Sequence, residues 1–286
     1  MSIKEIITKF RISNCQRKID YYKNKYCNLT DDIVTNRRAR ILGFKRLRYC
    51  NNKLSYTMPF AFYEPKNEKN IKLPLIIYLH GLANGDESNI IPFFGGFPFA
   101  FRLTKNIKKN PCYIIMPSIP ITETYVTVKD EKQKLDNSNC FDSLFTNLFE
   151  KIKNNYPIDE NRVYIVGSSD GAMGTYTQIK MHKERYAAAI PMMGAIFEND
   201  KSIYNDLMNI PLWVAHSKND KVVPITEFTE NNFKWNGTDI IVSTLKEKYK
   251  KNIKYTKYKY FGHRTSFIFM IKENWIDWIF KQSKNQ

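Results

Sequence analysis

The sequence predicts an α/β fold in which helices cover both faces of a mostly parallel, eight-stranded sheet. Three observations lead to this prediction. Short apolar runs of the kind that form buried parallel strands recur along the chain, and segments with helical periodicity separate them. The 286 residues, 43% of them hydrophobic, are also enough to bury a large core. Strands that alternate with helices in this way are typical of a parallel sheet.

The expected strands follow the apolar runs in chain order. Upstream of the parallel part, "FKRLRYC" (44–50) and "LSYTMPFAFYEP" (54–65) predict two strands that form an antiparallel hairpin. Buried parallel strands are expected at 73–81, 111–118, 162–168, 186–194 and 210–217. An edge strand is expected at 252–263, where polar and aromatic residues alternate. The expected helices occupy 98–109, 141–155, 170–184, 202–208, 238–250 and 272–282.

We expect a single globular domain over residues 43–286, preceded by a basic, helical extension over residues 1–42. The five cysteines form no C-x-x-C pair, and their odd number argues against a closed disulfide framework. Charged residues interrupt the apolar ones at the start of the chain, unlike in a signal peptide, and no apolar stretch is long enough to span a bilayer. These features predict a cytoplasmic protein without a membrane span. The sequence does not fix the oligomeric state.

The net charge of +17 raises the question of a nucleic-acid partner. The densest basic run is at 36–48, but the remaining excess is mostly lysine spread along the whole chain, which is typical of a compositional bias. We therefore expect no nucleic-acid partner. Neither an H-x-x-x-H motif, nor a carboxylate cluster at ligand spacing, nor a phosphate-binding glycine loop occurs, so no metal and no cofactor are expected.

The stretch "RVYIVGSSDGAMGTY" (162–176) carries the candidate nucleophile. Residues 167–171 match G-x-S-x-G at the carboxyl end of an expected strand, the edge of a parallel sheet where ligands bind. The spacing predicts a strained turn that lifts the hydroxyl of Ser169 clear of the backbone, while the two glycines let strand and helix pass closely. A glycine-rich turn without chemistry is the alternative.

A serine hydroxyl needs a base to accept its proton, and the chain has four histidines. His263, in "FGHRTS", follows the last expected strand, where the base belongs when the chain order is serine, acid, histidine. His216 ends the strand "PLWVAHS" and is the competitor for this role. His182 lies among lysine and glutamate on an expected helix, the usual setting of a solvated histidine. His80 precedes the nucleophile, and its place before a glycine suggests another role.

The acid and the oxyanion donors are assigned by position. Asp220, in the polar turn of "AHSKNDKVVP", is the candidate acid, Glu198 is the reserve, and a purely local turn role for Asp220 is the alternative. A tetrahedral oxyanion needs donors already in place. We expect them to be the backbone N–H groups of Asp170, directly after the nucleophile, and Leu82, in the loop after "LIIYLHG".

Several of these segments occur together in a characteristic order: "LPLIIYLHGLANGDESN", "CYIIMPSIP", "IDENRVYIVGSSDGAMGTY", "YAAAIPMMG", "IPLWVAHSKNDKVVP" and "YKYFGHRTS". In this order they resemble the α/β-hydrolase superfamily over roughly residues 55–283. The chain is similar in particular to the polyhydroxybutyrate-depolymerase-like and feruloyl-esterase-like group, and also to prolyl-oligopeptidase-type peptidases. The Asp-x-x-Arg of "IDENRVYIVG" recurs in that group.

The resemblance implies a serine hydrolase that cleaves small carboxylic esters without a cofactor. Ser169 would be its nucleophile, Asp220 the acid and His263 the base, with an oxyanion hole at Leu82 and Asp170. A serine peptidase of prolyl-oligopeptidase type and a non-catalytic binding protein with a basic surface are the alternatives.

The sequence also departs from the pattern of these relatives. Asp170 places a carboxylate beside the expected oxyanion, which would disfavour anionic substrates unless the side chain points away. Ala172 replaces an expected glycine, and "RTS" follows His263 where an aromatic residue is expected. The long polar stretch 121–140 is expected to form a flap, and the phenylalanines of 89–101 are candidates for an apolar acyl or alcohol pocket.

Overall fold

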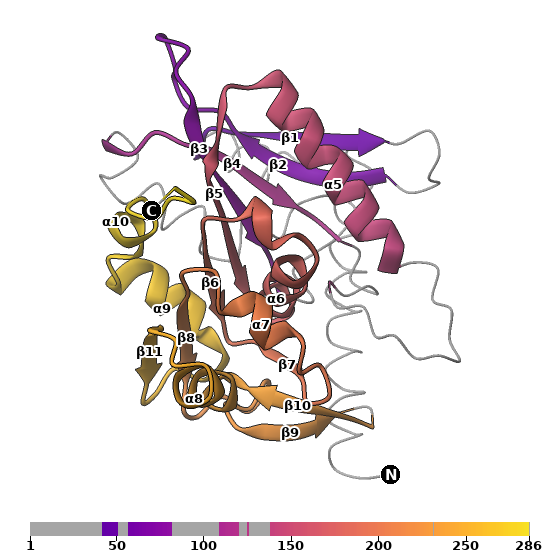
Figure 1. Ribbon diagram of the computed structural model, residues 1–286. Helices are drawn as coiled ribbons and strands as arrows, with labels where there is room; N and C mark the ends of the chain where they lie inside the picture. Colours follow the sequence, from indigo (N-terminus) through magenta and orange to yellow (C-terminus); the bar gives the residue numbers. More distant parts are fainter. Residues whose placement is uncertain are drawn as a thin grey trace.

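The structure is a computed structural model that describes residues 42–50, 57–81, 109–119, 125, 138–230 and 232–285 (Figure 1). Several expectations therefore lie outside the described residues. They are the extension over 1–42 except its last residue, the helix at 98–109 except its last residue, Leu82, the phenylalanines of 89–101, and most of the polar stretch 121–140.

The main sheet has eight strands in the order β1-β2-β4-β3-β5-β6-β8-β11, and in Figure 1 it runs from the indigo strands at the top to β11 at the lower left. Its strands are β1 (Phe44–Cys50), β2 (Thr57–Tyr63), β3 (Leu73–Leu79), β4 (Tyr113–Pro117), β5 (Ile158–Ser168), β6 (Ala188–Met192), β8 (Trp213–Ser217) and β11 (Lys254–Tyr258). β2 pairs antiparallel with β1 and β4, and the remaining pairs are parallel. The expected mostly parallel, eight-stranded sheet is confirmed.

Helices cover both faces of this sheet. They are α5 (Ser138–Asn155), α6 (Asp170–His182), α7 (Ile203–Leu207), α8 (Thr238–Glu247), α9 (Thr265–Lys272) and α10 (Trp275–Ile279), with 3-10 turns at Lys183–Arg185 and Gly262–Arg264. Successive strand residues point to opposite faces. Ile77 of β3 and Ile165 of β5 thus join the core under α5 to α8, whereas Ile76 and Val166 join the core under α9 and α10.

Two parts of the fold differ from the sequence-based expectation. A second, three-stranded antiparallel sheet consists of β7 (Ala195–Phe197), β10 (Phe233–Gly237) and β9 (Glu227–Glu230), and Phe197 packs on Trp235 with 3.9 Å between ring centroids. These strands are only three to five residues long and partly exposed, so no apolar run marks them. The expected strand 252–263 is shorter, because the chain turns after Tyr258 and continues into α9, a helix that the sequence did not predict.

The Asp-x-x-Arg motif lies at the start of β5, at the end of the strand remote from Ser169. The guanidinium of Arg162 donates to a carboxylate oxygen of Asp159 at 2.6 Å, and the backbone N–H of Asn161 donates to the other oxygen at 3.1 Å. Here the register of β5 against β3 shifts between the pairs formed by Leu73 and Leu75. The hydrogen bonds of the motif thus lie where the strand pairing is irregular, which is a structural role.

Candidate active site

Ser169 lies in the turn between the end of β5 and the first residue of α6. Its backbone has φ 58° and ψ −121°, a conformation that a side-chain-bearing residue adopts only at a cost of about 1 to 3 kcal/mol. The backbone N–H of Ser169 donates to the carbonyl oxygen of Met192 at 2.9 Å, which ties the turn to the end of β6. The chain is therefore strained at the expected nucleophile, as the G-x-S-x-G spacing predicts.

The two glycines of the motif make this turn possible. A Cβ atom on Gly167 would overlap the carbonyl oxygen of Gly171, and one on Gly171 would overlap the carbonyl oxygen of Leu79 in β3. At Ala172, where a glycine was expected, the room comes from the facing loop. A Cβ on Gly194 would lie 2.7 Å from the Cβ of Ala172. The methyl group of Ala172 therefore fits because residue 194 is a glycine.

The structure brings Ser169, His263 and Asp220 together from three loops that follow β5, β11 and β8. The Nε2 atom of His263 lies 2.8 Å from Ser169 Oγ, and its Nδ1 atom lies 2.8 Å from Asp220 Oδ2. The His263 side chain keeps 23% of its surface exposed, whereas that of Asp220 is fully buried. A neutral imidazole in this position can accept the serine proton through Nε2 while Nδ1–H donates to the carboxylate.

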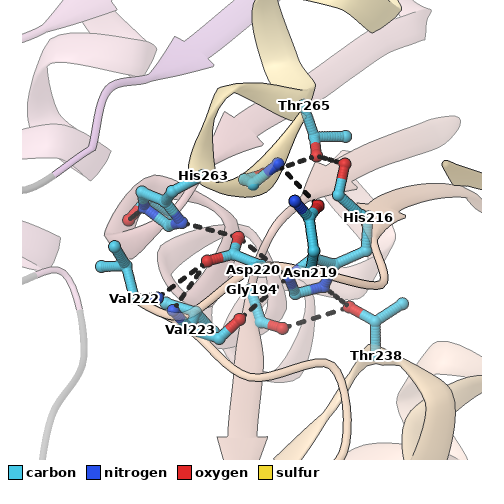
Figure 2. Close-up of polar contacts among 12 residues, drawn as sticks. Gly194, His216, Asn219, Asp220, Val222, Val223, Thr238, His263 and Thr265 are labelled. Carbon is cyan, nitrogen blue, oxygen red and sulfur yellow. Dashed lines mark hydrogen bonds and ion pairs between the residues drawn. The ribbon is translucent and has the colours of Figure 1, made fainter. Parts of the chain in front are cut away.

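The carboxylate of Asp220 accepts hydrogen bonds at both oxygens (Figure 2). Oδ1 accepts the backbone N–H groups of Val222 at 2.9 Å and Val223 at 3.2 Å, and Oδ2 faces His263 and His216. Burial alone would raise the pKa of this carboxyl group. The hydrogen bonds from the two histidines and from Val222, together with the charge that His263 can carry, outweigh burial and hold the pKa well below its usual range.

His216, the competing candidate for the base, lies beside the acid rather than beside the serine. Its side chain is fully buried. Its Nε2 atom is 3.2 Å from Asp220 Oδ2, and its Nδ1 atom is 2.7 Å from the hydroxyl of Thr238. In the described part of the chain, His263 is the histidine that contacts Ser169 Oγ.

Hydrogen bonds also clamp the loop of His263 to the loop of Asp220. The backbone N–H of Gly262 donates to the side-chain oxygen of Asn219 at 2.9 Å, and the hydroxyl groups of Ser217 and Thr265 are 2.7 Å apart. Phe261 and Gly262 both have positive φ, 125° and 50°, where the chain reverses before His263. Sequence reasoning missed this clamp, although Asn219 stands directly before the candidate acid.

On the oxyanion side, the structure describes one of the two expected donors. Asp170 is the first residue of α6, where backbone N–H groups and the helix dipole favour negative charge. Its buried carboxylate accepts the backbone N–H of Tyr125 at 3.2 Å. The second expected donor, Leu82, lies outside the described residues.

His80 directly follows β3 and precedes the expected oxyanion loop. Its Nε2 atom accepts the backbone N–H of Ile119 at 3.2 Å, so the hydrogen of the neutral ring is on Nδ1, which donates to the carbonyl oxygen of Gly81 at 2.9 Å. Burial lowers the pKa of His80 to about 4. The ring is therefore neutral near pH 7, and it holds the Gly81 carbonyl in place.

The remaining candidates lie apart from this constellation. His182 was expected to be solvated, but it is only partly exposed and pairs with Asp142 of α5 at 3.0 Å. Glu198, the reserve acid, follows β7 in the second sheet, where its backbone N–H donates to the backbone carbonyl oxygen of Lys234. Within the described part of the chain, no group of histidine, cysteine and carboxylate residues could hold a metal ion, and no helix is both long and apolar enough to cross a membrane.

The fold resembles those of proteins of known structure. The structure of a thermostable esterase matches with a TM-score of 0.71 and 25% sequence identity over 84% of this chain. The present chain spans 63% of the length of that esterase. The chain has the α/β-hydrolase fold. No protein-family profile and no curated protein sequence match it.

Other proteins of known structure share the α/β-hydrolase fold with this chain. An S-formylglutathione hydrolase from Agrobacterium tumefaciens has a TM-score of 0.59 and 15% identity, covering 84% of this chain and 96% of its own. A ferulic acid esterase has a TM-score of 0.56 and 14% identity, covering 83% of this chain and 94% of its own. Acylaminoacyl peptidases share the fold as well. The fold class and the resemblance to α/β hydrolases expected from the sequence are thereby confirmed.

Proposed function

We propose that the protein is a serine hydrolase that cleaves small carboxylic esters through an acyl-enzyme. Ser169 is the nucleophile, His263 the general base and Asp220 the acid that orients it. The observation that carries the proposal is the continuous contact from Ser169 Oγ to His263 Nε2 and from His263 Nδ1 to Asp220 Oδ2, each 2.8 Å long. A base must lie within hydrogen-bond reach of the proton that it takes, and a purely structural site has no need of this alignment.

In the proposed reaction, Oγ of Ser169 attacks the ester carbonyl carbon while its proton moves to Nε2 of His263. The backbone N–H groups of Asp170 and Leu82 stabilise the oxyanion. The carbon–oxygen bond to the alcohol then breaks, and His263 returns the proton to the departing alcohol. Water then attacks the acyl-enzyme with His263 again as base, the bond between the acyl group and Ser169 Oγ breaks, and His263 returns the proton to Oγ, which releases the carboxylic acid. Asp220 stays ionised throughout, in line with its lowered pKa.

The substrate proposed for this site is a small, uncharged ester with an apolar or aromatic group. The carboxylate of Asp170, next to the nucleophile, disfavours a substrate that itself carries a negative charge. The reaction uses water as its second substrate and calls for no cofactor or metal ion. The phenylalanines of 89–101 remain the proposed source of an apolar pocket.

An ester substrate is favoured over a peptide because a thermostable esterase matches with a TM-score of 0.71, against 0.54 and 0.57 for two acylaminoacyl peptidases. A peptidase of prolyl-oligopeptidase type is the second candidate, because acylaminoacyl peptidases share the fold. A non-catalytic protein that binds an acidic partner through its basic surface is the third. The cytoplasmic location and the lack of a nucleic-acid partner stay predictions from composition.

The test is incubation with a fluorophosphonate probe, read by intact mass, for the wild type and Ser169→Ala. We expect one adduct on the wild type and none on the variant, and a matched Ser168→Ala variant should still be labelled. A folded wild type that takes no adduct would contradict an activated serine and favour the binding protein. Labelled wild type is then assayed on esters and on acylated amino-acid amides, where faster amide cleavage would favour the peptidase.

A further inference from the structure

His216 is a second imidazole on the carboxylate of Asp220, and the proposed reaction does not use it. Its side chain is fully buried at the end of β8. Its Nε2 atom is 3.2 Å from Asp220 Oδ2 and 3.1 Å from the carbonyl oxygen of Val223. Both of these oxygens are acceptors, so Nε2 carries a hydrogen. His216 therefore donates to the same carboxylate oxygen that receives His263.

The other ring nitrogen of His216 depends on a single hydroxyl hydrogen. Nδ1 is 2.7 Å from Thr238 Oγ1, and this hydroxyl also lies 3.2 Å from the carbonyl oxygen of Gly194. If His216 is neutral, Thr238 donates its hydrogen to Nδ1. If His216 is protonated, Nδ1–H donates to Thr238, which then donates to Gly194. The hydrogen bond between the ring and the hydroxyl thus reverses with the charge of the ring.

Only the neutral arrangement suits the proposed chemistry. His263 becomes positively charged when it takes the serine proton, and Asp220 stabilises that charge. A second imidazolium on the same oxygen would repel the first. Within the described residues, Asp220 is the titratable side chain in contact with His216, and His263 lies on the other side of it (Figure 2).

We propose that neutral His216, with its hydrogen on Nε2, is a positioning residue for Asp220, and that Thr238 holds it in this tautomer. The inference rests on the proposed hydrolase function. With His216, the carboxylate has four donors, two on each oxygen: the backbone of Val222 and Val223 on Oδ1, and His216 and His263 on Oδ2. The carboxylate cannot rotate without losing some of them, so Oδ2 stays aimed at His263.

The same chain of contacts reaches the nucleophile turn. Thr238 is the first residue of α8, and Gly194 belongs to the loop after β6. The Gly194 backbone packs against Ala172 of α6, and Met192, the last residue of β6, accepts the backbone N–H of Ser169. His216 therefore connects the acid to the element that holds the nucleophile.

The first experiment compares His216→Phe, which keeps a ring but loses both nitrogens, with His216→Gln, whose amide can donate near the place of Nε2. We expect His216→Phe to lower kcat on a small ester roughly 10- to 100-fold with little change in KM, by analogy with the loss of a hydrogen-bond partner that orients a metal ligand. The acidic limb of the pH–rate profile should move to higher pH, because Asp220 with one donor fewer attracts the His263 imidazolium more strongly. His216→Gln should recover part of kcat and return the limb toward the wild-type position.

A second pair tests the tautomer without touching His216. Thr238→Val removes the hydroxyl at nearly constant shape and should lower kcat, whereas Thr238→Ser should retain most of it. Ser243→Ala is the matched control, because Ser243 lies on the same helix and its hydroxyl donates to the carbonyl oxygen of Ile240 in that helix. This pair also decides the question if His216→Phe fails to fold.

The outcomes separate the two proposals. A labelled, active wild type together with Thr238→Val and folded His216 variants that match its kcat and pH profile would overturn the positioning role and leave the hydrolase function intact. A fall in activity that only follows the folded fraction, with the acidic limb unmoved, would also overturn it. Failure of the wild type to react with the fluorophosphonate would instead contradict the hydrolase function itself. The downfield NMR resonance of the His263 Nδ1 hydrogen gives an independent readout and should shift in Thr238→Val but not in Ser243→Ala.

Discussion

Ser169 is held by its backbone, whereas Asp220 and His263 are held by side-chain hydrogen bonds. The nucleophile turn depends on a strained φ of 58° and on two glycines that leave no room for a side chain. The facing loops have more space and are joined by polar contacts, such as that between Asn219 and the Gly262 backbone at 2.9 Å. Substitutions in the turn of Ser169 should therefore lower mainly the stability of the fold. Substitutions in the loops of Asp220 and His263 should lower mainly the reaction rate, because they misalign the two side chains.

The largest expected effect comes from adding one methyl group on the nucleophile side. Gly171→Ala places a Cβ onto the carbonyl oxygen of Leu79, and backbone atoms of a central strand cannot move aside. We expect a loss of unfolding free energy of about 3 kcal/mol or more, and little soluble protein. Gly262→Ala is the counterpart in the facing loop. The nearest atom to its Cβ is 3.9 Å away and its φ is 50°, so only about 1 kcal/mol should be lost. Denaturant titration measures both, and equal losses would contradict the contrast.

The next effect concerns the acid. Asp220→Asn keeps the shape and an acceptor for the backbone of Val222, but its amide can present an N–H to His263 Nδ1 and so favour the wrong tautomer. The rate of fluorophosphonate labelling should fall roughly 10,000-fold while the protein stays folded. Circular dichroism checks the fold. Labelling at the wild-type rate would show that Asp220 does not orient the base.

Acid should weaken the two sides in different pH windows. The folded-state pKa of His80 is lowered to about 4 from 6.5, so the unfolded chain binds a proton that the folded one does not. The contribution of neutral His80 to the free energy of unfolding is fully present above pH 6.5, and it falls by about 3 kcal/mol as the pH drops to 4. For Asp220, also lowered, the loss begins only below about pH 4 and continues as the pH falls toward its folded-state pKa.

The measurement is the free energy of unfolding against pH for the wild type and His80→Asn. The variant should be less stable overall, but its slope between pH 4 and 6.5 should be flatter. An unchanged slope in that window would show that His80 does not carry this pH dependence.

The smallest expected effect is in the clamp between the two loops. Asn219→Ala removes the acceptor of the Gly262 N–H on an exposed side chain, so stability should change by about 1 kcal/mol or less. The rate should nevertheless fall, by roughly tenfold if the lost alignment of His263 costs a similar energy. Asn209→Ala removes an exposed hydrogen bond from a residue just after α7 to the carbonyl oxygen of Asn205 in that helix, and it serves as the control, with no expected change in rate. Equal rates in the two variants would argue against the clamp.

The sequence predicted the parts of the protein that local patterns encode. Buried strands such as β3 and the second half of β5 are apolar runs, and the G-x-S-x-G spacing marks the turn at Ser169 because only glycine fits on either side of it. Chain order then indicated Asp220 and His263, each in a polar turn after a strand. These residues lie in hydrogen-bonded contact, and their catalytic roles stay a proposal.

What the sequence could not predict depends on contacts across the fold. Thr238 carries no local signal, yet it meets His216 from another element, 22 residues along the chain. The second sheet is stabilised by packing of Phe197 on Trp235, not by a hydrophobic run. Helix α9 follows a turn whose shape is set by the positive φ of Phe261 and Gly262. Side-chain partners of this kind become visible only when the elements are assembled.

The strained backbone of Ser169 has a consequence for engineering. Glycine adopts φ 58° and ψ −121° without a Cβ penalty, so exchanging the serine for glycine relaxes the turn and removes the hydroxyl in one step. Selection for heat resistance alone would thus favour loss of the nucleophile. A campaign to make this protein more thermostable therefore has to screen for turnover in every round, and the inactive glycine form is a natural starting point for trapping bound esters in crystals.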